Sequence, residues 1–149
     1  MRLPWYLYKY NVGVAMSFND MFRLSCHAVI LNNDGYVLQL QHTYNNNIWG
    51  LPGGSVNPGE TIHEALYREC LEELNIKIEI NNLTGVYFHS KYNSQVFIFM
   101  CSFNDNEKIV LSNEHSAFAF FPIDALDSIQ KIRVMDAINY TGSVMSRKF

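Results

Sequence analysis

The chain has few cysteines, and their spacing matches no disulfide or metal-binding motif. Its 149 residues include three widely spaced thiols, Cys26, Cys70 and Cys101, with no Cys-x-x-Cys pair. This spacing argues against a disulfide framework and against a zinc site. Unpaired thiols fit a reducing cytosol, so we expect a cytoplasmic protein in which the three thiols fill the core.

A long apolar stretch is also missing. No segment is long and apolar enough to span a bilayer, and residues 4–10, although aromatic, lack the features of a signal peptide. We therefore expect an N-terminal aromatic arm, residues 1–22, followed by one domain, residues 23–149. The arm packs on the domain or on a second subunit, which leaves a homodimer open. The alternative is contact with a membrane surface.

Positive charge is scarce. The chain has 11 Lys and Arg against 14 Asp and Glu, a formal net charge of −3, and no long basic run. Nucleic acid is therefore not an expected partner, because its binding depends on clustered basic residues. Small anionic ligands stay compatible with the sequence if a cation neutralises the acidic groups. A hydrophobic content of 48% fits one globular domain with a substantial core.

The acidic residues concentrate after a Pro-Gly turn at residues 58–59. Thr61 and Glu64 match the Ser/Thr-x-x-Glu capping box, which predicts a helix from Thr61 to Leu74. At about 100° of rotation per residue, three carboxylates lie within one arc of this helix and apolar residues occupy another. The carboxylates are those of Glu69, Glu72 and Glu73, and the apolar residues expected in the core are Leu66, Tyr67, Cys70, Leu71 and Leu74.

Like charges on one helical face oppose one another unless a cation binds them. A hard divalent ion such as Mg²⁺ prefers carboxylate and carbonyl oxygens and bridges to substrate phosphates, so we expect a metal site here. The alternative is a solvated acidic face. Arg68 can contact Glu64 or Glu72 and orient a carboxylate, or it forms a surface ion pair of little energetic value.

The segment before the helix, Trp49-Gly50-Leu51-Pro52-Gly53-Gly54, combines an aromatic residue with glycines. Glycine lets the backbone approach a ligand or adopt positive φ, so this loop can place a carbonyl oxygen beside the metal. On its own the segment indicates no more than a turn.

Together these residues resemble the Nudix box, GX5EX7REUXEEXGU, in which U is aliphatic. Asn75 replaces the last glycine, and asparagine tolerates the left-handed conformation that ends a helix. Cys70 stands at an aliphatic position, where a buried thiol behaves as a small hydrophobe. Every charged position of the pattern agrees, and the matching residues are Gly54, Glu60, Arg68, Glu69, Glu72 and Glu73.

The resemblance implies a single-domain α/β/α sandwich with a mixed β-sheet, and Mg²⁺ as cofactor with Mn²⁺ as an alternative. It implies hydrolysis of a pyrophosphate bond in a nucleoside diphosphate linked to another moiety, such as a nucleoside triphosphate, a dinucleoside polyphosphate or a nucleotide sugar. The alternative is a Nudix-fold nucleotide sensor or binding module without turnover. Because the acidic triad is intact, we favour the enzyme.

Metal ligands follow from the same resemblance. Glu69 and Glu73 are the expected principal ligands, and the carbonyl of Gly53 or Gly54 is an extra one. Glu60 is expected to support the loop and the surroundings of the metal.

The general base stays open between two residues. Glu72 is either a further metal ligand or the base, and Arg68 orients the carboxylates of this catalytic centre. Glu114 is the second candidate base, because family members often carry a glutamate in a loop before an aromatic strand. Its alternative is a solvated loop acid, since a base must meet a geometric test.

Substrate contacts are expected from His42 and Tyr44, near the mouth of the site, and from Tyr92, whose ring can stack on a base. Packing within the sheet is the alternative for Tyr92. The five histidines share no ligand spacing, so we interpret them as surface or packing residues.

The rest of the chain alternates between β-rich and helical patterns. An Asp-Gly step at residues 34–35 predicts a hairpin between strands 25–31 and 36–41. A short strand is expected around Trp49, a turn at Gly53 and Gly54, and further turns at residues 81–82 and 104–106. The other strands are expected at 77–80, 86–89, 95–103 and 118–121, and a closing helix at 134–140, all forming one mixed sheet covered by helices.

Overall fold

The computed structural model describes residues 21–44 and 48–149. The expected arm, residues 1–22, falls outside these ranges except for its last two residues, so its role stays a prediction. The described chain forms β1 (Arg23–Ile30), β2 (Val37–His42), β3 (Trp49–Gly50), β4 (Gly53–Ser55), α1 (Ile62–Leu74), β5 (Glu79–His89), β6 (Ser94–Ser102), β7 (His115–Phe121), α2 (Ser128–Ile138) and β8 (Met145–Lys148). Short 3₁₀ turns occupy Ser90–Tyr92 and Ile123–Ala125.

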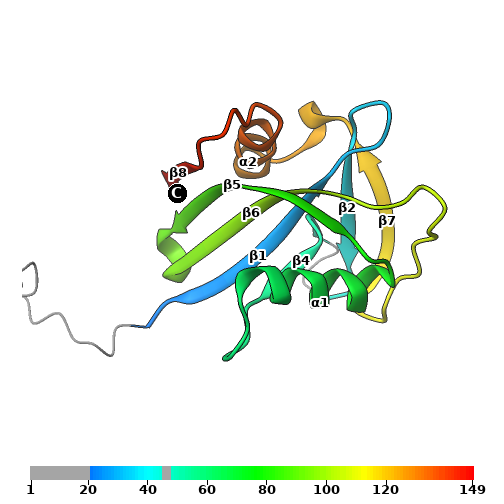
Figure 1. Ribbon diagram of the computed structural model, residues 1–149, viewed down its shortest axis with the longest axis horizontal. Helices are drawn as coiled ribbons and strands as arrows, with labels where there is room; N and C mark the ends of the chain where they lie inside the picture. Colours follow the sequence, from blue (N-terminus) through cyan, green and yellow to red (C-terminus); the bar gives the residue numbers. More distant parts are fainter. Residues whose placement is uncertain (1–20, 45–47) are drawn as a thin grey trace, which may run out of the picture.

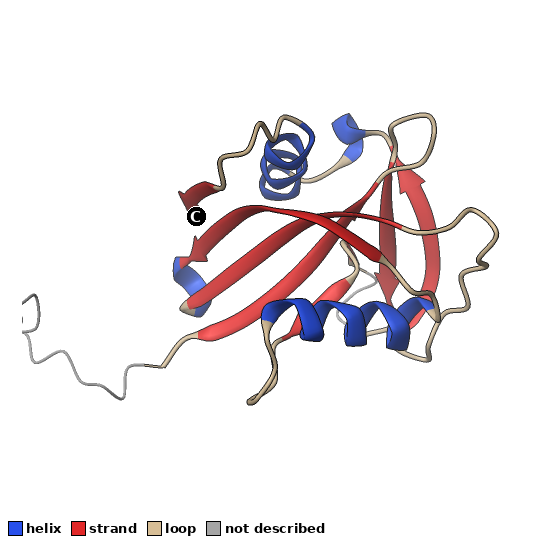
Figure 2. Cartoon of the chain, viewed as in Figure 1, coloured by secondary structure: helices blue, strands red, loops and turns tan. Residues whose placement is uncertain are grey.

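The helices cover opposite faces of a five-stranded sheet (Figures 1 and 2). Its strand order is β4-β1-β6-β5-β8, with β1 parallel to β6, β5 parallel to β8, and the other pairs antiparallel. A second, antiparallel sheet of order β3-β2-β7 lies beside it. The layered α/β class is therefore confirmed, but the expectation of one sheet is wrong.

The two sheets separate at the predicted hairpin. The turn forms: the Asn32 side chain accepts hydrogen bonds from the backbone N–H groups of Asp34 and Tyr36, and Gly35 has φ 77°. However, β1 and β2 share only the single bridge between Leu31 and Val37 and then join different sheets. The local turn chemistry was predicted correctly, whereas the pairing of the strands was not.

Helix α1 begins and ends as its sequence predicts. Thr61 Oγ1 accepts from Glu64 N–H and the Glu64 carboxylate accepts from Thr61 N–H, so both halves of the capping box are present. Asn75 closes the helix in the left-handed conformation, with φ 55°. Since Glu64 caps the helix, Arg68 is paired elsewhere, and a contact between Arg68 and Glu64 is not observed.

The buried face of α1 differs from the predicted one. Tyr67 and Leu71 are 46% and 48% exposed, so the prediction that they pack in the core is wrong. The helix rests on the sheet through Ala65, Leu66, Cys70 and Leu74, which are fully buried. Spacings of three and four residues from these positions bring Glu73 onto the same face, where it is 5% exposed.

Three other predicted elements are corrected. Residues 79–89 form one strand, because two β-bulges between Ile80 and Gly85 absorb the irregularity that predicted a turn at residues 81–82. Gly53–Ser55 is strand β4 rather than a turn. Helix α2 begins at Ser128, where Asp127 accepts hydrogen bonds from two N–H groups, and ends at Ile138, so the predicted range 134–140 covers only its second half and extends past its end. Strand β8 was not predicted.

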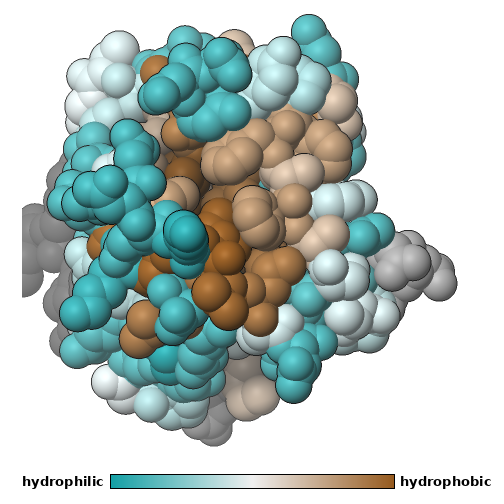
Figure 3. Space-filling model, turned by 90° about the vertical axis from the view of Figure 1, so that its right-hand side faces the viewer, coloured by the Kyte–Doolittle hydropathy of each residue, from teal (hydrophilic) through white to brown (hydrophobic). Residues whose placement is uncertain are grey.

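The core has one part on each face of the five-stranded sheet. Alternation along β1 sends Cys26, Ala28 and Ile30 toward α1 and Val29 toward α2. All three cysteines are buried and unpaired, as predicted. Figure 3 views the side on which β7 lies in Figure 1, and apolar side chains gather at its centre; Phe118 of β7 is 42% exposed. Within the described residues, neither helix is long and apolar enough to cross a membrane.

Candidate functional site

Arg68 of α1 gathers several acceptors at one guanidinium. Its Nε and Nη2 donate to the two Glu60 oxygens at 2.5 and 3.0 Å, and Nη2 also donates to the Ser55 carbonyl at 3.0 Å. Its Nη1 reaches Glu69 at 2.8 Å and Glu72 at 3.3 Å. The pKa of Glu60 is lowered, chiefly by this hydrogen bonding. The hydrogen bonds of Arg68 therefore connect the loop before α1 to the acidic side of the helix.

Glu73 is a buried acid in an acidic environment. Its Oε2 accepts from Gly53 N–H at 2.9 Å. Burial, together with the charges of Glu69, Glu114 and Glu72, raises the pKa of Glu73 to about 8, against the opposing effect of the Gly53 hydrogen bond. The structure thus brings three of the predicted acids within electrostatic reach of the fourth, Glu73.

Gly54 lies directly against the carboxylate of Glu69. A Cβ atom at Gly54 would stand 2.6–2.7 Å from the carboxylate atoms of Glu69, so only glycine leaves room for this carboxylate. The carbonyl of Gly54 faces β1, where it accepts a long contact of 3.7 Å from Cys26 Sγ. The contribution of Gly54 seen here is therefore space for Glu69, and its role as a carbonyl ligand stays a prediction.

The two candidate bases, Glu72 and Glu114, have different surroundings. The side chain of Glu72 is 59% exposed, and it forms an ion pair with Arg68, which also pairs with Glu69. Glu114 lies in the loop just before β7, and its carbonyl oxygen accepts from the N–H and Oγ1 of Thr43 at 3.0 and 3.1 Å. Both side chains are exposed to solvent, while their charges still raise the pKa of Glu73.

The donor set fits a hard divalent cation. Carboxylate oxygens converge on the Gly53–Gly54 backbone, and Glu73 is an acid that burial and neighbouring acids keep from ionising until a cation compensates the charge. Within residues 21–44 and 48–149, no three His, Cys, Asp or Glu side chains already surround a common point, because Glu69 and Glu72 are turned toward Arg68. Glu69 and Glu73 are the residues that would hold the ion.

His115, which was interpreted only as a surface or packing residue, lies beside Glu73, and its neighbour His42 is an expected substrate contact. His115 Nε2 lies 3.7 Å from Glu73 Oε1, too far for a hydrogen bond, and the His42 and His115 ring centroids are 4.8 Å apart. Burial lowers the pKa of His115, so the contact joins neutral groups. Tyr44 is 59% exposed and packs on His42 at 5.5 Å. His42 and Tyr44 therefore border the acidic centre through His115.

Tyr92 is not near the acids. Its ring packs against His89 at 5.1 Å, is 50% exposed, and lines a cavity on the α2 face of the five-stranded sheet. Two polar residues of that cavity, Gln130 and Arg133, were missed by the sequence reasoning. The Asp-Ser pair at residues 127–128, a helix-start pattern, could have placed both on α2.

Comparison with known proteins matches this arrangement to one family. The family model described as NUDIX domain matches residues 21–138. A MutT-like protein of Streptomyces ambofaciens is 28% identical over 123 residues, which is 80% of this chain and 79% of the relative. A putative 8-oxo-dGTP diphosphatase of Bacillus subtilis strain 168 is 29% identical over 94 residues, 63% of this chain and 62% of the relative.

Solved structures agree on the fold. An ADP-ribose pyrophosphatase of Streptococcus suis 89-1591 superposes with a TM-score of 0.70 over 87% of this chain and 100% of that one. The sequence identity is 18%, so this match supports the fold and nothing more specific.

Proposed function

Because the chain belongs to the Nudix hydrolase family, we propose that it hydrolyses a pyrophosphate bond in a nucleoside diphosphate linked to another moiety, with Mg²⁺ as cofactor. One relative, of which the chain spans 62%, is named as a putative 8-oxo-dGTP diphosphatase, and one structural neighbour is named as an ADP-ribose pyrophosphatase. Nucleoside triphosphates, dinucleoside polyphosphates and nucleotide sugars share the bond concerned.

One observation carries this proposal. Glu73 is buried against the Gly53 amide with the charges of Glu69, Glu114 and Glu72 acting on it, and its pKa is raised to about 8. Folding such a group inside a protein costs free energy unless a partner compensates its charge. A divalent cation is the compensating partner, and its chemistry serves phosphate-bond cleavage.

Each residue of the centre has a distinct task in the reaction. Glu69 and Glu73 would hold the cation, which when bound would neutralise phosphate charge and acidify a water molecule. Arg68 fixes Glu69 and, through Glu60, the loop between β4 and α1. His115 packs on Glu73 and limits its rotation.

The reaction also needs a base for the attacking water. Water oxygen forms a bond to one phosphorus atom, the bond from that phosphorus to the bridging oxygen breaks, and the bridging oxygen leaves with the electron pair. The proton of the water passes to a carboxylate, for which Glu114 and Glu72 are the candidates. We favour Glu114, because the Glu72 carboxylate accepts a hydrogen bond from Arg68.

The proposal is tested with a nucleotide panel in Mg²⁺ and in Mn²⁺. We expect metal-dependent release of a phosphate-containing product, reduced at least about a hundredfold by Glu73→Gln. Glu79→Gln, the same change at an exposed position on β5, should have wild-type activity. Nucleotide binding without turnover by the wild-type protein would contradict the proposal and favour a sensor.

A second pair of variants assigns the base. Glu114→Gln should lower kcat by roughly 10²–10⁴ with little change in metal affinity. If its turnover is nearly that of the wild-type protein and Glu72→Gln carries the loss instead, then Glu72 is the base.

A further inference from the structure

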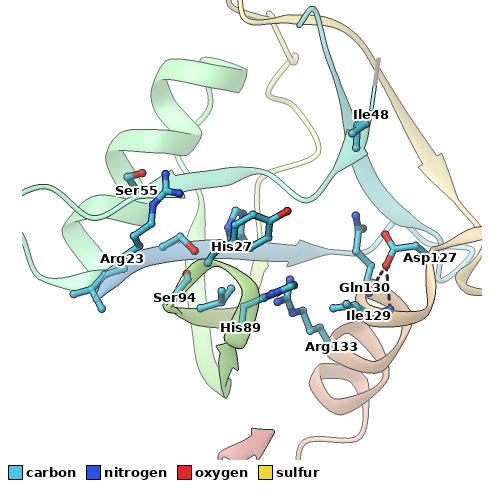
Figure 4. Close-up of a pocket in the computed structure, with 14 residues that line it drawn as sticks. Arg23, His27, Ile48, Ser55, His89, Ser94, Asp127, Ile129, Gln130 and Arg133 are labelled. Atoms are coloured by element: carbon cyan, nitrogen blue, oxygen red, sulfur yellow. Dashed lines mark hydrogen bonds between the residues drawn. The ribbon is translucent and has the colours of Figure 1, made fainter. Parts of the chain in front are cut away.

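A cavity of about 580 Å³ lies on the α2 face of the five-stranded sheet, bounded by β1, the Ser90–Tyr92 turn and α2 (Figure 4). It is notable for buried polar atoms without a hydrogen-bond partner in the described chain. Four of them belong to residues that line it: Nδ1 of His89, Oε1 of Gln130, and Nε and Nη2 of Arg133. These four atoms have almost no accessible surface, so a polar ligand would supply their missing partners once the side chains turn toward the cavity.

Arg133 is the central cationic group of this cavity. No carboxylate of the described residues lies within ion-pair distance of its guanidinium. The guanidinium packs over the rings of Tyr87 and Phe149, with centroid distances of 5.6 and 5.5 Å. Loss of solvent lowers the pKa of Arg133, although the group stays charged. Its Nε and Nη2 form the edge of the guanidinium that binds two acceptor atoms side by side.

Within the described chain, Asp127 forms no ion pair with Arg133, although its charge acts on the guanidinium. Its Oδ1 caps α2, accepting from Ile129 and Gln130 N–H at 3.0 and 2.9 Å. Other polar groups of the lining can donate hydrogen bonds: Arg23 and the hydroxyls of Ser25, Ser55 and Ser94 belong to it. Burial lowers the pKa of His27 to about 4, so its imidazole is neutral, and its hydrogen bond to the Leu51 backbone leaves the second ring nitrogen as an acceptor.

This cavity and the acidic centre are separated by one residue. Gly53 donates its N–H to Glu73 at 2.9 Å, and a Cβ on the same residue would lie 2.9 Å from Nδ1 of His27, which lines the cavity. Strand β4, which carries Gly53, is an edge strand of the five-stranded sheet. A substrate whose diphosphate lies at the acidic centre would have to extend around this edge to place another group in the cavity.

We propose that this cavity binds a phosphate monoester of the substrate, carried on the moiety that is not cleaved and held by the Nε–Nη2 edge of Arg133. The inference rests on the proposed function, because it concerns a second anionic group of the same substrate. A phosphate supplies several acceptor oxygens and the negative charge that Arg133 and Arg23 lack. The O6 and N7 atoms of guanine would also fit the Arg133 edge, but a neutral base leaves both charges uncompensated.

Binding without metal or hydrolysis tests the cavity. Calorimetric titrations in EDTA would compare 5′-AMP with the 2′,5′- and 3′,5′-bisphosphates of adenosine. At least one bisphosphate should bind roughly tenfold or more tightly than 5′-AMP. Arg133→Gln should remove this difference and Arg133→Lys should reduce it. Lys131→Gln, a loss of charge on the same helix outside the cavity lining, should preserve it.

Three results would overturn the inference. The first is equal or undetectable binding of all three nucleotides to the wild-type protein. The second is a gain by 5′-ADP that depends on Arg133 as strongly as the gain by a bisphosphate, since the cavity would then hold the hydrolysed phosphate chain. The third is an Arg133-dependent preference for 5′-GMP over 5′-AMP in place of the phosphate preference. A different result separates the two claims. If the wild-type protein hydrolyses no nucleotide but binds a bisphosphate through Arg133, then the phosphate site in the cavity is supported and the proposed function is contradicted.

Discussion

At the scale of single residues, the adjacent glycines Gly53 and Gly54 differ in what an added Cβ atom would contact. A Cβ at Gly53, which has φ +136°, would come within 2.1 Å of the Cys26 carbonyl and 2.7 Å of His27 Cα, both parts of the backbone. A Cβ at Gly54 would meet only the carboxylate of Glu69, the movable end of a side chain. The same substitution should therefore damage the fold at Gly53 and the metal site at Gly54.

Gly54→Ala should separate metal binding from folding. The added methyl group displaces the Glu69 carboxylate, so we expect affinity for Mg²⁺ or Mn²⁺ to fall about 10–100-fold. The melting temperature of the metal-free protein should change little, because the side chain can rotate away. Titration of Mn²⁺ followed by electron paramagnetic resonance measures the affinity directly.

Gly53→Ala is the matched comparison. Its methyl group meets backbone atoms and its φ strains any L-residue, so we expect loss of several kcal/mol of stability or failure to fold. Wild-type metal affinity in Gly54→Ala would contradict the position assigned to Glu69.

The sequence predicted the residues of the acidic centre better than their neighbours. Helix periodicity predicted that Glu69 and Glu73 share one side of α1, and the resemblance to the Nudix box selected them, with Gly54, as metal ligands, a role that stays a prediction. The contact between His115 and Glu73 could not be predicted in this way, since it depends on the pairing of β2 with β7 and on a register shift between Gln41 and His42. Irregular pairing of this kind has no local sequence pattern.

At the scale of elements, α1 owes its start to the capping box. Thr61→Ala removes the acceptor for Glu64 N–H, now 3.1 Å away, and should lower the free energy of unfolding by about 1 kcal/mol. Thr61→Ser keeps the hydroxyl and should lose much less. Urea denaturation of the three proteins measures the difference, and the slopes should be equal because the surface exposed on unfolding is the same. A Thr61→Ala midpoint equal to that of the wild-type protein would show that the cap contributes nothing.

Elements with strong local patterns were predicted, and those set by distant partners were not. Both ends of α1 follow from Thr61 and Asn75. Strand β4 contains Gly53 and Gly54, which have no β propensity; it is extended because it pairs with residues 25–27 of β1. Likewise β8 is a strand because it pairs with β5, and each of its residues is exposed.

At the scale of the whole molecule, the edge strand β4 lies between the two proposed sites, the acidic centre and the cavity. On one side it meets the acids of α1 and on the other it meets His27 and the cavity beneath α2. This placement requires the parallel pairing of β1 with β6, which brings distant parts of the chain together. Local patterns carry no information on such pairings, so the sequence predicted the acidic helix but not the cavity on the opposite face.

Glu73 also makes the stability of the whole protein depend on pH. Its carboxyl has an ordinary pKa near 4.5 when unfolded and about 8 when folded, so between these values the folded state binds one more proton than the unfolded state. Its contribution is therefore fully present below pH 4.5 and is lost as pH rises through about 8. The histidines His27, His89 and His115 have lowered pKa values and act in the opposite direction, most strongly below about pH 6.5 and with an effect that fades above it.

Comparison with Glu73→Gln between pH 6.5 and 8 isolates this effect, because the histidines contribute equally to both proteins. In EDTA, the free energy of unfolding of the wild-type protein should fall relative to that of Glu73→Gln as pH rises, by at most about 1.4 kcal/mol per pH unit, the limit for one proton. Glu79→Gln should show the same fall relative to Glu73→Gln. Saturating Mg²⁺ should remove or reverse this fall, because the cation favours the ionised carboxylate in the folded state. A wild-type slope in EDTA equal to that of Glu73→Gln would contradict the raised pKa, and with it the view that the fold holds this acid ready for a cation.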